Sequence, residues 1–183
     1  MNWLPTLFIL AVAFVAVFLE GWCDLFRHWL GAQIDFLPAL MVYTSLTDGL
    51  AAVILLGVCG GLWFDALSLN PLGVSVLPLL LIGLVIYHSR ELLLRRHTFA
   101  QVVLGVVAGA AQPLGTLFLL LNLGCAPLLG WFSLWQWIVL AAGGGVITPL
   151  CFGLFDRLHG ALDYQPAKPA AFRPDREIKR GRQ

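Results

Sequence analysis

The chain has 183 residues, of which 60% are hydrophobic and 11% are charged, and its mean hydropathy is +0.87. Because soluble domains carry about a quarter of charged residues, this composition excludes an ordinary soluble domain and predicts an all-α membrane protein. The net charge of +1 gives no sign of a nucleic-acid partner, and we expect none.

The first apolar segment covers residues 4–19. No Lys or Arg precedes it and no small-residue cleavage site follows it, so we interpret it as a retained membrane helix rather than a signal peptide. The semi-polar stretch EGWCDLFRHWLGAQID follows at residues 20–35. Its aromatic residues fit a short amphipathic helix in the membrane interface, and they fit equally a continuation of the first helix into the headgroups.

Residues 36–64 contain a single charge, Asp48, within TSLTDGL. One helix of that length would measure about 44 Å, which is too long for a hydrocarbon core of about 30 Å without strong tilt. Asp-Gly is a turn signal. We therefore predict two helices, at residues 34–47 and 49–64, and both are short for a membrane span.

Three further apolar segments cover about residues 71–89, 99–123 and 134–155. Pro78 lies inside the first of them, and we expect it to kink that helix. Residues 163–183 are basic, contain three prolines and lack an apolar face, which predicts a disordered cytoplasmic tail. The sequence thus predicts a six-helix transmembrane domain at residues 1–162.

The distribution of Lys and Arg predicts the topology. They concentrate in residues 90–96 and in the tail from Arg157 onward, and only Arg27 lies elsewhere. Six spans with a cytoplasmic N-terminus place ten of the eleven on the cytoplasmic side, as the positive-inside rule requires. Five spans, with residues 36–64 as one helix, satisfy the rule too, but the Asp-Gly break favours six. The six-span topology also gathers six tryptophans near the outer interface: Trp22, Trp29, Trp63, Trp131, Trp135 and Trp137.

Residues that could carry catalysis do not cluster in the sequence. There is no zinc-protease, nucleophile-elbow, P-loop or dinucleotide-binding motif, and the four histidines are spread through the chain. The four cysteines are scattered as well, although Cys23 and Cys125 could meet at the outer face in a disulfide. We therefore expect no catalytic residue, metal or cofactor, and no enzyme.

Small residues are the strongest signal within the apolar segments. Gly57 and Gly61 form one G-x-x-x-G motif, Gly105 and Gly109 form another, and residues 143–145 are three consecutive glycines. Such surfaces let helix backbones approach closely, either within the protein or against a partner helix, and internal packing is favoured. Gln112 and Asn122, the polar residues deepest in a segment, are expected to bridge helices.

The stretch GGLWFDALSLNPLG at residues 60–73 joins two of the predicted helices. Asn70 and Pro71 fit the N-cap and first turn of the second helix, and Gly73 would allow a close backbone approach. Asp65 opposes the dipole of its own helix but would lie near the next helix N-terminus, where negative charge is favourable. Two interpretations stay open: a self-capped tight turn, or a polar hook for a partner at the outer face.

This stretch resembles the signature region of the MreD family of bacterial rod-shape-determining proteins, in which a glycine-rich helix, an aspartate and a short link precede Pro-Leu-Gly. The matching residues are Gly57, Gly61, Leu62, Asp65, Pro71, Leu72 and Gly73. Pro38 and Tyr43 upstream, and the basic loop with Arg90, Arg95 and Arg96, fit the family too. The similarity covers residues 4–162, and its specific part is residues 36–96.

The resemblance implies a six-helix protein of the bacterial inner membrane, related in fold to the substrate-binding subunits of energy-coupling-factor transporters. It implies a non-enzymatic subunit of the lateral wall-synthesis complex, with an MreC-like single-span protein, the MreB filament, a glycosyltransferase and a transpeptidase as partners. The basic loop could also contact anionic lipids.

Two other functions compete with this one. A vitamin-binding transporter subunit would be expected to carry Ala-x-x-x-Ala on its first helix, but Ala11 is paired with Val15 and Ala13 with Val17. An intramembrane enzyme would need an acid, base or metal set placed together, and the sequence offers none.

Overall fold

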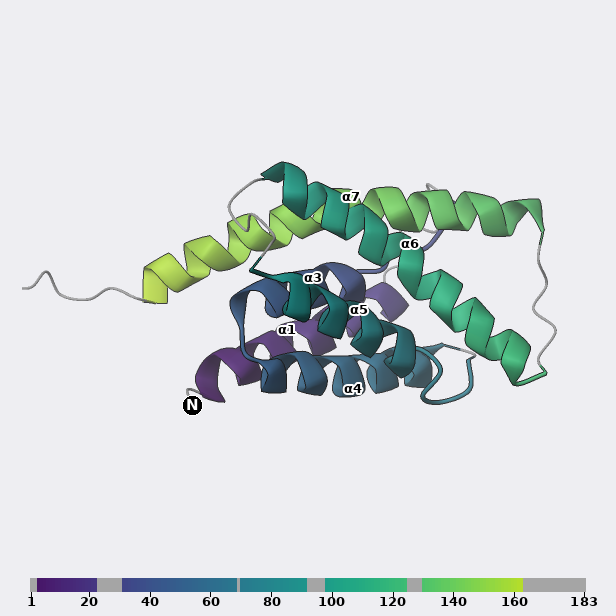
Figure 1. Cartoon of the computed structure of the whole chain (residues 1–183), viewed down its shortest axis with the longest axis horizontal. Coiled ribbons are helices and arrows are strands. Elements are labelled where there is room, and N and C mark those ends of the chain that lie inside the picture. The colour runs from purple at the N-terminus through teal and green to yellow at the C-terminus, as the bar shows by residue number, and fades with distance from the viewer. Residues whose placement is uncertain (1–2, 23–30, 69, 92–97, 125–129, 163–183) are drawn as a thin grey trace, which may run out of the picture.

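The computed structural model of the chain describes residues 3–22, 31–68, 70–91, 98–124 and 130–162. These residues form six α-helices and confirm the all-α class (Figure 1). The helices are α1 (Trp3–Trp22), α3 (Leu37–Thr47), α4 (Leu50–Leu67), α5 (Val76–Ser89), α6 (Thr98–Asn122) and α7 (Trp131–Leu162).

Four of the expectations fall wholly or partly outside the described residues. They are the amphipathic helix within residues 20–35, the basic-loop residues Arg95 and Arg96, the pairing of Cys23 with Cys125, and the tail at residues 163–183.

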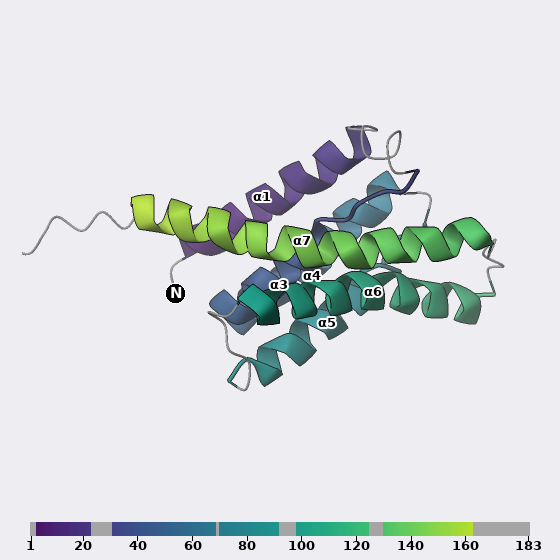
Figure 2. The ribbon, with the colours of Figure 1, turned by 90° about the horizontal axis from the view of Figure 1, so that it is seen from above.

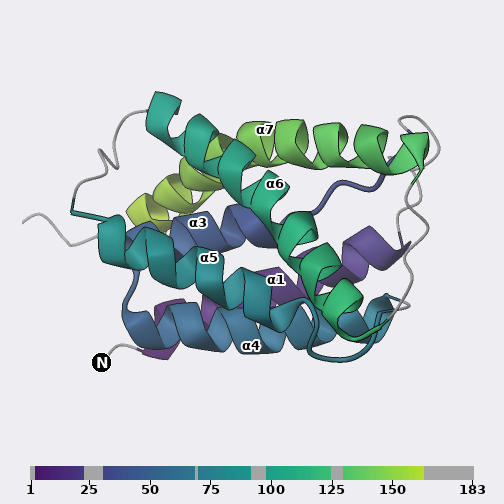
Figure 3. The same cartoon turned by 45° about the vertical axis from the view of Figure 1, so that its right-hand side comes forward.

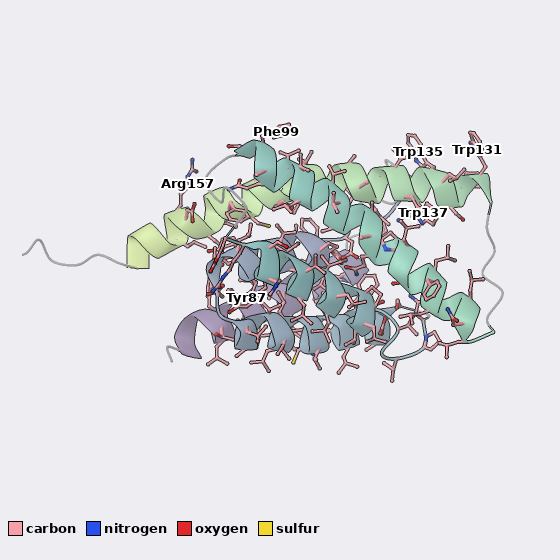
Figure 4. The ribbon with its side chains drawn as sticks, in the orientation of Figure 1. Tyr87, Phe99, Trp131, Trp135, Trp137 and Arg157 are labelled. Carbon is pink, nitrogen blue, oxygen red and sulfur yellow. The ribbon has the colours of Figure 1, made fainter. Side chains whose placement is uncertain are left out.

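Successive helices run back and forth between two ends of the molecule (Figure 1). One end holds the start of α1, the α3–α4 and α5–α6 connections and the end of α7; we call it the arginine end, after Arg90 and Arg157. The opposite end holds the end of α1, the α4–α5 and α6–α7 connections and the start of α7. We call it the tryptophan end, after Trp22, Trp131, Trp135 and Trp137, and Figure 4 shows the last three there and Arg157 at the other end.

The short helix α3 lies in the centre of the bundle and contacts all five other helices. Every residue from Leu37 to Leu46 is buried, so α3 has no outward face. Its polar side chains bond along their own helix: Thr44 Oγ1 donates to the Leu40 carbonyl at 2.9 Å and Ser45 Oγ donates to the Met41 carbonyl at 2.7 Å. These bonds remove the penalty of burying hydroxyl groups.

Three helices are long and apolar enough to cross a membrane: α4, α6 and α7, the last over Trp131–Leu158. The other three, α1 from Thr6, α3 and α5, are apolar but shorter. At about 1.5 Å per residue α3 measures about 16 Å. Its neighbours bury Leu37–Leu46, and the chain reaches the surface at Gly49, just past the C-terminal end of the helix.

The run at residues 36–64 is broken as the Asp-Gly signal predicts, and a single helix over this run is wrong. The helix α3 ends at Thr47, where the Asp48 N–H donates to the Thr44 carbonyl at 2.9 Å. Gly49 is the N-cap of α4, which runs back toward the tryptophan end (Figure 3).

The predicted start of α5 is wrong. Asn70 and Pro71 lie in the connection, and the helix begins at Val76 with Ser75 as its N-cap residue. Gly73 has φ +93° and interrupts helical geometry between Pro71 and the true start. Pro78 is therefore the third residue of α5, where its missing N–H removes no intrahelical hydrogen bond, so the expected kink has no cause.

Candidate functional site

The carboxylate of Asp65 fastens the α4–α5 connection at the tryptophan end. Asp65 lies in the last turn of α4 and is only 1% exposed. Its Oδ2 accepts hydrogen bonds from the Gly73 N–H at 2.7 Å and the Ser75 N–H at 3.1 Å. It thereby satisfies backbone donors that precede α5, where the helix dipole favours a negative charge.

Gly73 gives the connection the shape that this contact needs. Its φ of +93° is a conformation that L side chains rarely adopt, and it directs the N–H toward Asp65. The turn is closed further by the Val74 N–H, which donates to the Pro71 carbonyl at 3.3 Å. Asp65 is thus engaged within the turn, and its burial leaves no surface for direct contact with a partner.

The exposed residues of the signature are apolar. Leu72, at the tip of the connection, is 72% exposed, and Leu62 and Leu67 on α4 are exposed too. Asn70 is half-buried. The connection therefore presents a leucine on a backbone that Asp65 holds in place.

Gly57 and Gly61 pack α4 against α5. A Cβ atom on Gly57 would lie 2.4 Å from Leu80 Cδ2, and one on Gly61 would lie 2.8 Å from the Val76 Cα. Both distances are shorter than real Cβ contacts, so the absence of side chains is what allows α5 to sit on this face. The face is occupied within the protein and is not open to a partner helix.

Gly105 and Gly109 pack α6 against α7, which lie side by side in Figure 2. A Cβ on Gly105 would lie 2.2 Å from the Gly144 carbonyl oxygen, and one on Gly144 would lie 2.3 Å from the Gly105 carbonyl oxygen. A Cβ on Gly109 would lie 2.6 Å from the Leu140 carbonyl oxygen. The backbones of the two helices are therefore in direct contact where they cross.

A polar cluster at the tryptophan end consists of half-buried Glu20 and the buried residues Asp35 and Gln112. Glu20 Oε1 accepts a hydrogen bond from the Phe36 N–H, and Asp35 Oδ1 accepts one from the Leu37 N–H at 3.2 Å. Gln112 Nε2 on α6 donates to Asp35 Oδ2 at 3.3 Å. The cluster thus links the end of α1 and the middle of α6 to the segment that leads into α3.

The sequence indicated only part of this cluster. Gln112 was expected to bridge helices, and it bonds instead to Asp35 in the segment before α3. Asn122 makes no bridge through Nδ2, which donates to the Phe118 carbonyl of its own helix at 2.7 Å. The sequence analysis did not identify Glu20 and Asp35 as members of a buried site. Their position was a usable signal, because they are the first and last residues of the semi-polar stretch and each is adjacent in sequence to an apolar segment.

Asp35 lies outside the helices, and its environment changes its acidity. Burial raises the pKa of its carboxyl from 3.8 to about 6, against the opposing effect of the Leu37 N–H bond. Two oxygens of the cluster, Glu20 Oε2 and Gln112 Oε1, are buried and have no hydrogen-bond partner within the described part of the chain.

A cavity of about 230 Å³ adjoins the cluster. It is lined by side chains from α4, α6, α7, the segment before α3 and the α4–α5 connection: Gln33, Asp35, Phe64, Asn70, Gln112, Pro113, Thr116, Leu117, Leu120, Gln136 and Leu140. The Gln136 amide closes one wall, because it accepts from the Gln33 N–H at 3.2 Å and donates to the Gln33 carbonyl at 2.9 Å.

The arginine end carries Arg90 from the predicted basic loop. Its guanidinium lies 4.2 Å from the centre of the Tyr87 ring, and it donates to the Asp48 carbonyl at 3.4 Å. Arg90 is exposed, as is Arg157 on α7 (Figure 4). Both cations could face anionic headgroups or a partner at this end.

Within the ranges that the structure describes, no three His, Cys, Asp or Glu side chains come together in a way that could hold a metal ion. Cys59 and Cys151 are free thiols. The signature turn, the glycine contacts and the polar cavity are therefore the features on which a function can be argued. Comparison of the chain with family models, curated proteins and solved structures finds no match.

Proposed function

We propose that the chain is a non-enzymatic integral membrane subunit of the bacterial cell-elongation complex, which maintains rod shape by binding an MreC-like single-span partner. The proposal rests on the MreD-like signature at residues 57–73. The chain would bind the remaining wall-elongation proteins either directly or through that partner; these are the MreB filament, the glycosyltransferase and the transpeptidase. The bundle would lie in the cytoplasmic membrane as six spans.

One observation carries the proposal: the signature residues act together in a single structural unit. Gly57 and Gly61 seat α5 on α4, Asp65 binds the Gly73 and Ser75 N–H groups, and Leu72 is left exposed on the fixed turn. An exposed apolar side chain on a backbone that is already held in place can fill a pocket on a partner at little entropic cost. Leu72 is therefore the contact that we assign to the partner.

The alternating course of the helices supports the six-span topology. An even number of crossings puts the N-terminus and the tail on one side of the membrane, together with Arg90 and Arg157. Positive charge favours the cytoplasmic side. The tryptophan end, with Leu72, would then face outward, and the aromatic side chains would lie at the outer interface.

The test of partner binding is a co-purification experiment on the full chain with its MreC-like partner. Leu72→Ser should lower recovery of the partner at least tenfold without lowering thermal stability. Leu123→Ser is the matched control, because Leu123 is also exposed in a connection at the tryptophan end. Partner recovery that is equal for both variants would refute the assignment of Leu72.

A cellular test addresses the function itself. Depletion of the protein should turn rods into spheres and disperse sites of lateral wall insertion. Depleted cells that keep their rod shape and their pattern of wall insertion would refute the proposed function, whatever the co-purification result.

The cavity is the reason to consider a second candidate, a small-molecule-binding subunit of the energy-coupling-factor type. Its volume of about 230 Å³ lies below the roughly 300–1,000 Å³ of ordinary ligand pockets. A vitamin-sized ligand would therefore need the cavity to enlarge. Co-purification of a stoichiometric vitamin would establish this candidate in place of the first.

A further inference from the structure

The cavity at the tryptophan end lies where α6 and α7 separate. The two helices touch at Gly105 and Gly144 and then diverge toward Asn122 and Trp131 (Figures 1 and 3). One side of the cavity is formed by α6 between Gln112 and Leu120, and another by Gln136 and Leu140 of α7.

Gln112 leaves an acceptor unused at this cavity. It lines the cavity and is only 3% exposed. Its Nε2 donates to Asp35 Oδ2 at 3.3 Å, and this bond fixes the orientation of the amide, because an ionised carboxylate can only accept. Oε1 is then left buried without a partner in the described part of the chain.

The charge around the cavity is negative. Asp35 lines it and supplies this charge. The Lys and Arg residues in the described ranges are Arg90 and Arg157, and both lie at the arginine end. A group that enters the cavity would therefore meet acceptors and negative charge, and would be held best if it brought N–H donors and a positive charge.

The size of the cavity restricts the group further. Its volume of about 230 Å³ lies below the roughly 300–1,000 Å³ of ordinary ligand pockets, which suits a headgroup or a small molecule. Phe64, Leu117 and Leu140 add apolar wall, which suits a short methylene chain beside the charged group.

We propose that this cavity binds a primary ammonium group, with Asp35 as its counter-ion and Gln112 Oε1 as a hydrogen-bond acceptor. The source is either the headgroup of an aminophospholipid or a small soluble amine such as ethanolamine. The inference does not depend on the function proposed above, since it rests on the cavity alone.

The test uses the purified full chain in phosphatidylcholine nanodiscs, with thermal unfolding as the readout. Choline is the matched control for ethanolamine, because its trimethylated nitrogen has the same charge and no N–H donor. If the source is a soluble amine, ethanolamine should raise the melting temperature saturably, with an affinity at least tenfold above that of choline. If the source is a lipid, phosphatidylethanolamine nanodiscs should raise it and free ethanolamine should not.

Variants link the response to the cavity. Gln112→Leu should lower the affinity for the effective amine at least tenfold, whereas Asn122→Leu, on the same helix but outside the cavity lining, should leave it unchanged. Thr116→Phe, which fills the cavity from another position, should abolish the response if Gln112→Leu does not fold. The proposal is overturned if neither ethanolamine nor phosphatidylethanolamine stabilises the wild-type chain, if choline acts equally, or if folded cavity variants respond as the wild type does.

Discussion

The direct backbone contact between α6 and α7 makes a sharp prediction about Gly105. An added Cβ would lie 2.2 Å from the Gly144 carbonyl oxygen and 2.4 Å from Thr148 Oγ1. The shorter distance is about 0.8 Å less than the 3.0 Å below which real Cβ contacts essentially never fall. Neither obstacle can yield easily, because one is backbone and Thr148 Oγ1 is held by the Gly144 carbonyl at 2.7 Å.

Gly105→Ala should therefore force the helices apart at their crossing. Overpacking of this kind typically costs about 1–3 kcal/mol, and we expect the upper half of that range because the contact is with main chain. Gly144→Ala should cost a similar amount, since its Cβ would lie 2.3 Å from the Gly105 carbonyl oxygen. The double variant should cost less than the two single changes together, because the first separation already relieves the second clash.

Gly153→Ala is the matched control. Gly153 lies in α7, and a Cβ there would meet nothing within 4 Å. Alanine at such a helical position should raise stability by about 0.4–1 kcal/mol. Thermal and denaturant unfolding of the full chain in nanodiscs measures all variants. If Gly105→Ala proves as stable as Gly153→Ala, the reasoning about the crossing is wrong.

Three further predictions concern the tryptophan end. Asp65→Asn should lower the free energy of unfolding by about 1.5–3 kcal/mol, because a neutral amide accepts the Gly73 and Ser75 N–H bonds more weakly than the charged carboxylate does. Asp156→Asn, at an exposed site, should change it by less than about 0.5 kcal/mol. Equal effects of the two variants in unfolding experiments would contradict the capping role. The raised pKa of Asp35 means that the folded state holds its proton more tightly than the unfolded state, so this stabilisation is fully present below about pH 4 and stability should fall as pH rises through about 6. Asp35→Asn should flatten that part of the pH profile, and an unchanged profile would exclude Asp35 as its source. Gly73→Ala should cost about 1–2 kcal/mol because of its positive φ, and Gly130→Ala, equally open but without positive φ, should cost less; a melting-temperature ranking in the opposite order would refute the strain argument.

The sequence was sufficient for the helices because each is an apolar run between polar breaks. The Asp48-Gly49 break was predicted correctly, since a turn signal of this kind acts through local backbone geometry. The start of α5 was not, although Asn70-Pro71 is a good local signal. There, the carboxylate of Asp65 captures the N–H groups of Gly73 and Ser75 and delays the helix, and this tertiary contact overrides local preference.

The polar cavity could not be predicted from the sequence at all. The bond between Gln112 and Asp35 joins residues that are 77 positions apart. It depends on how α6 packs against α3 and the segment before it, a contact that the sequence does not identify. Gln112 itself was recognisable, because an amide deep in an apolar segment needs a partner.

The enclosed position of α3 has a consequence for how the chain is made. At 11 residues it is too short to settle in a bilayer alone, and α5, α6 and α7, which follow it in the chain, form much of its surroundings. During synthesis the side of α3 that these helices contact should stay uncovered until they have been made. Chains that stop after Ser89 lack α6 and α7, so one flank of α3 should stay uncovered and these chains should become substrates for membrane quality control. The packing of α6 and α7 against α3 is therefore the last step of assembly.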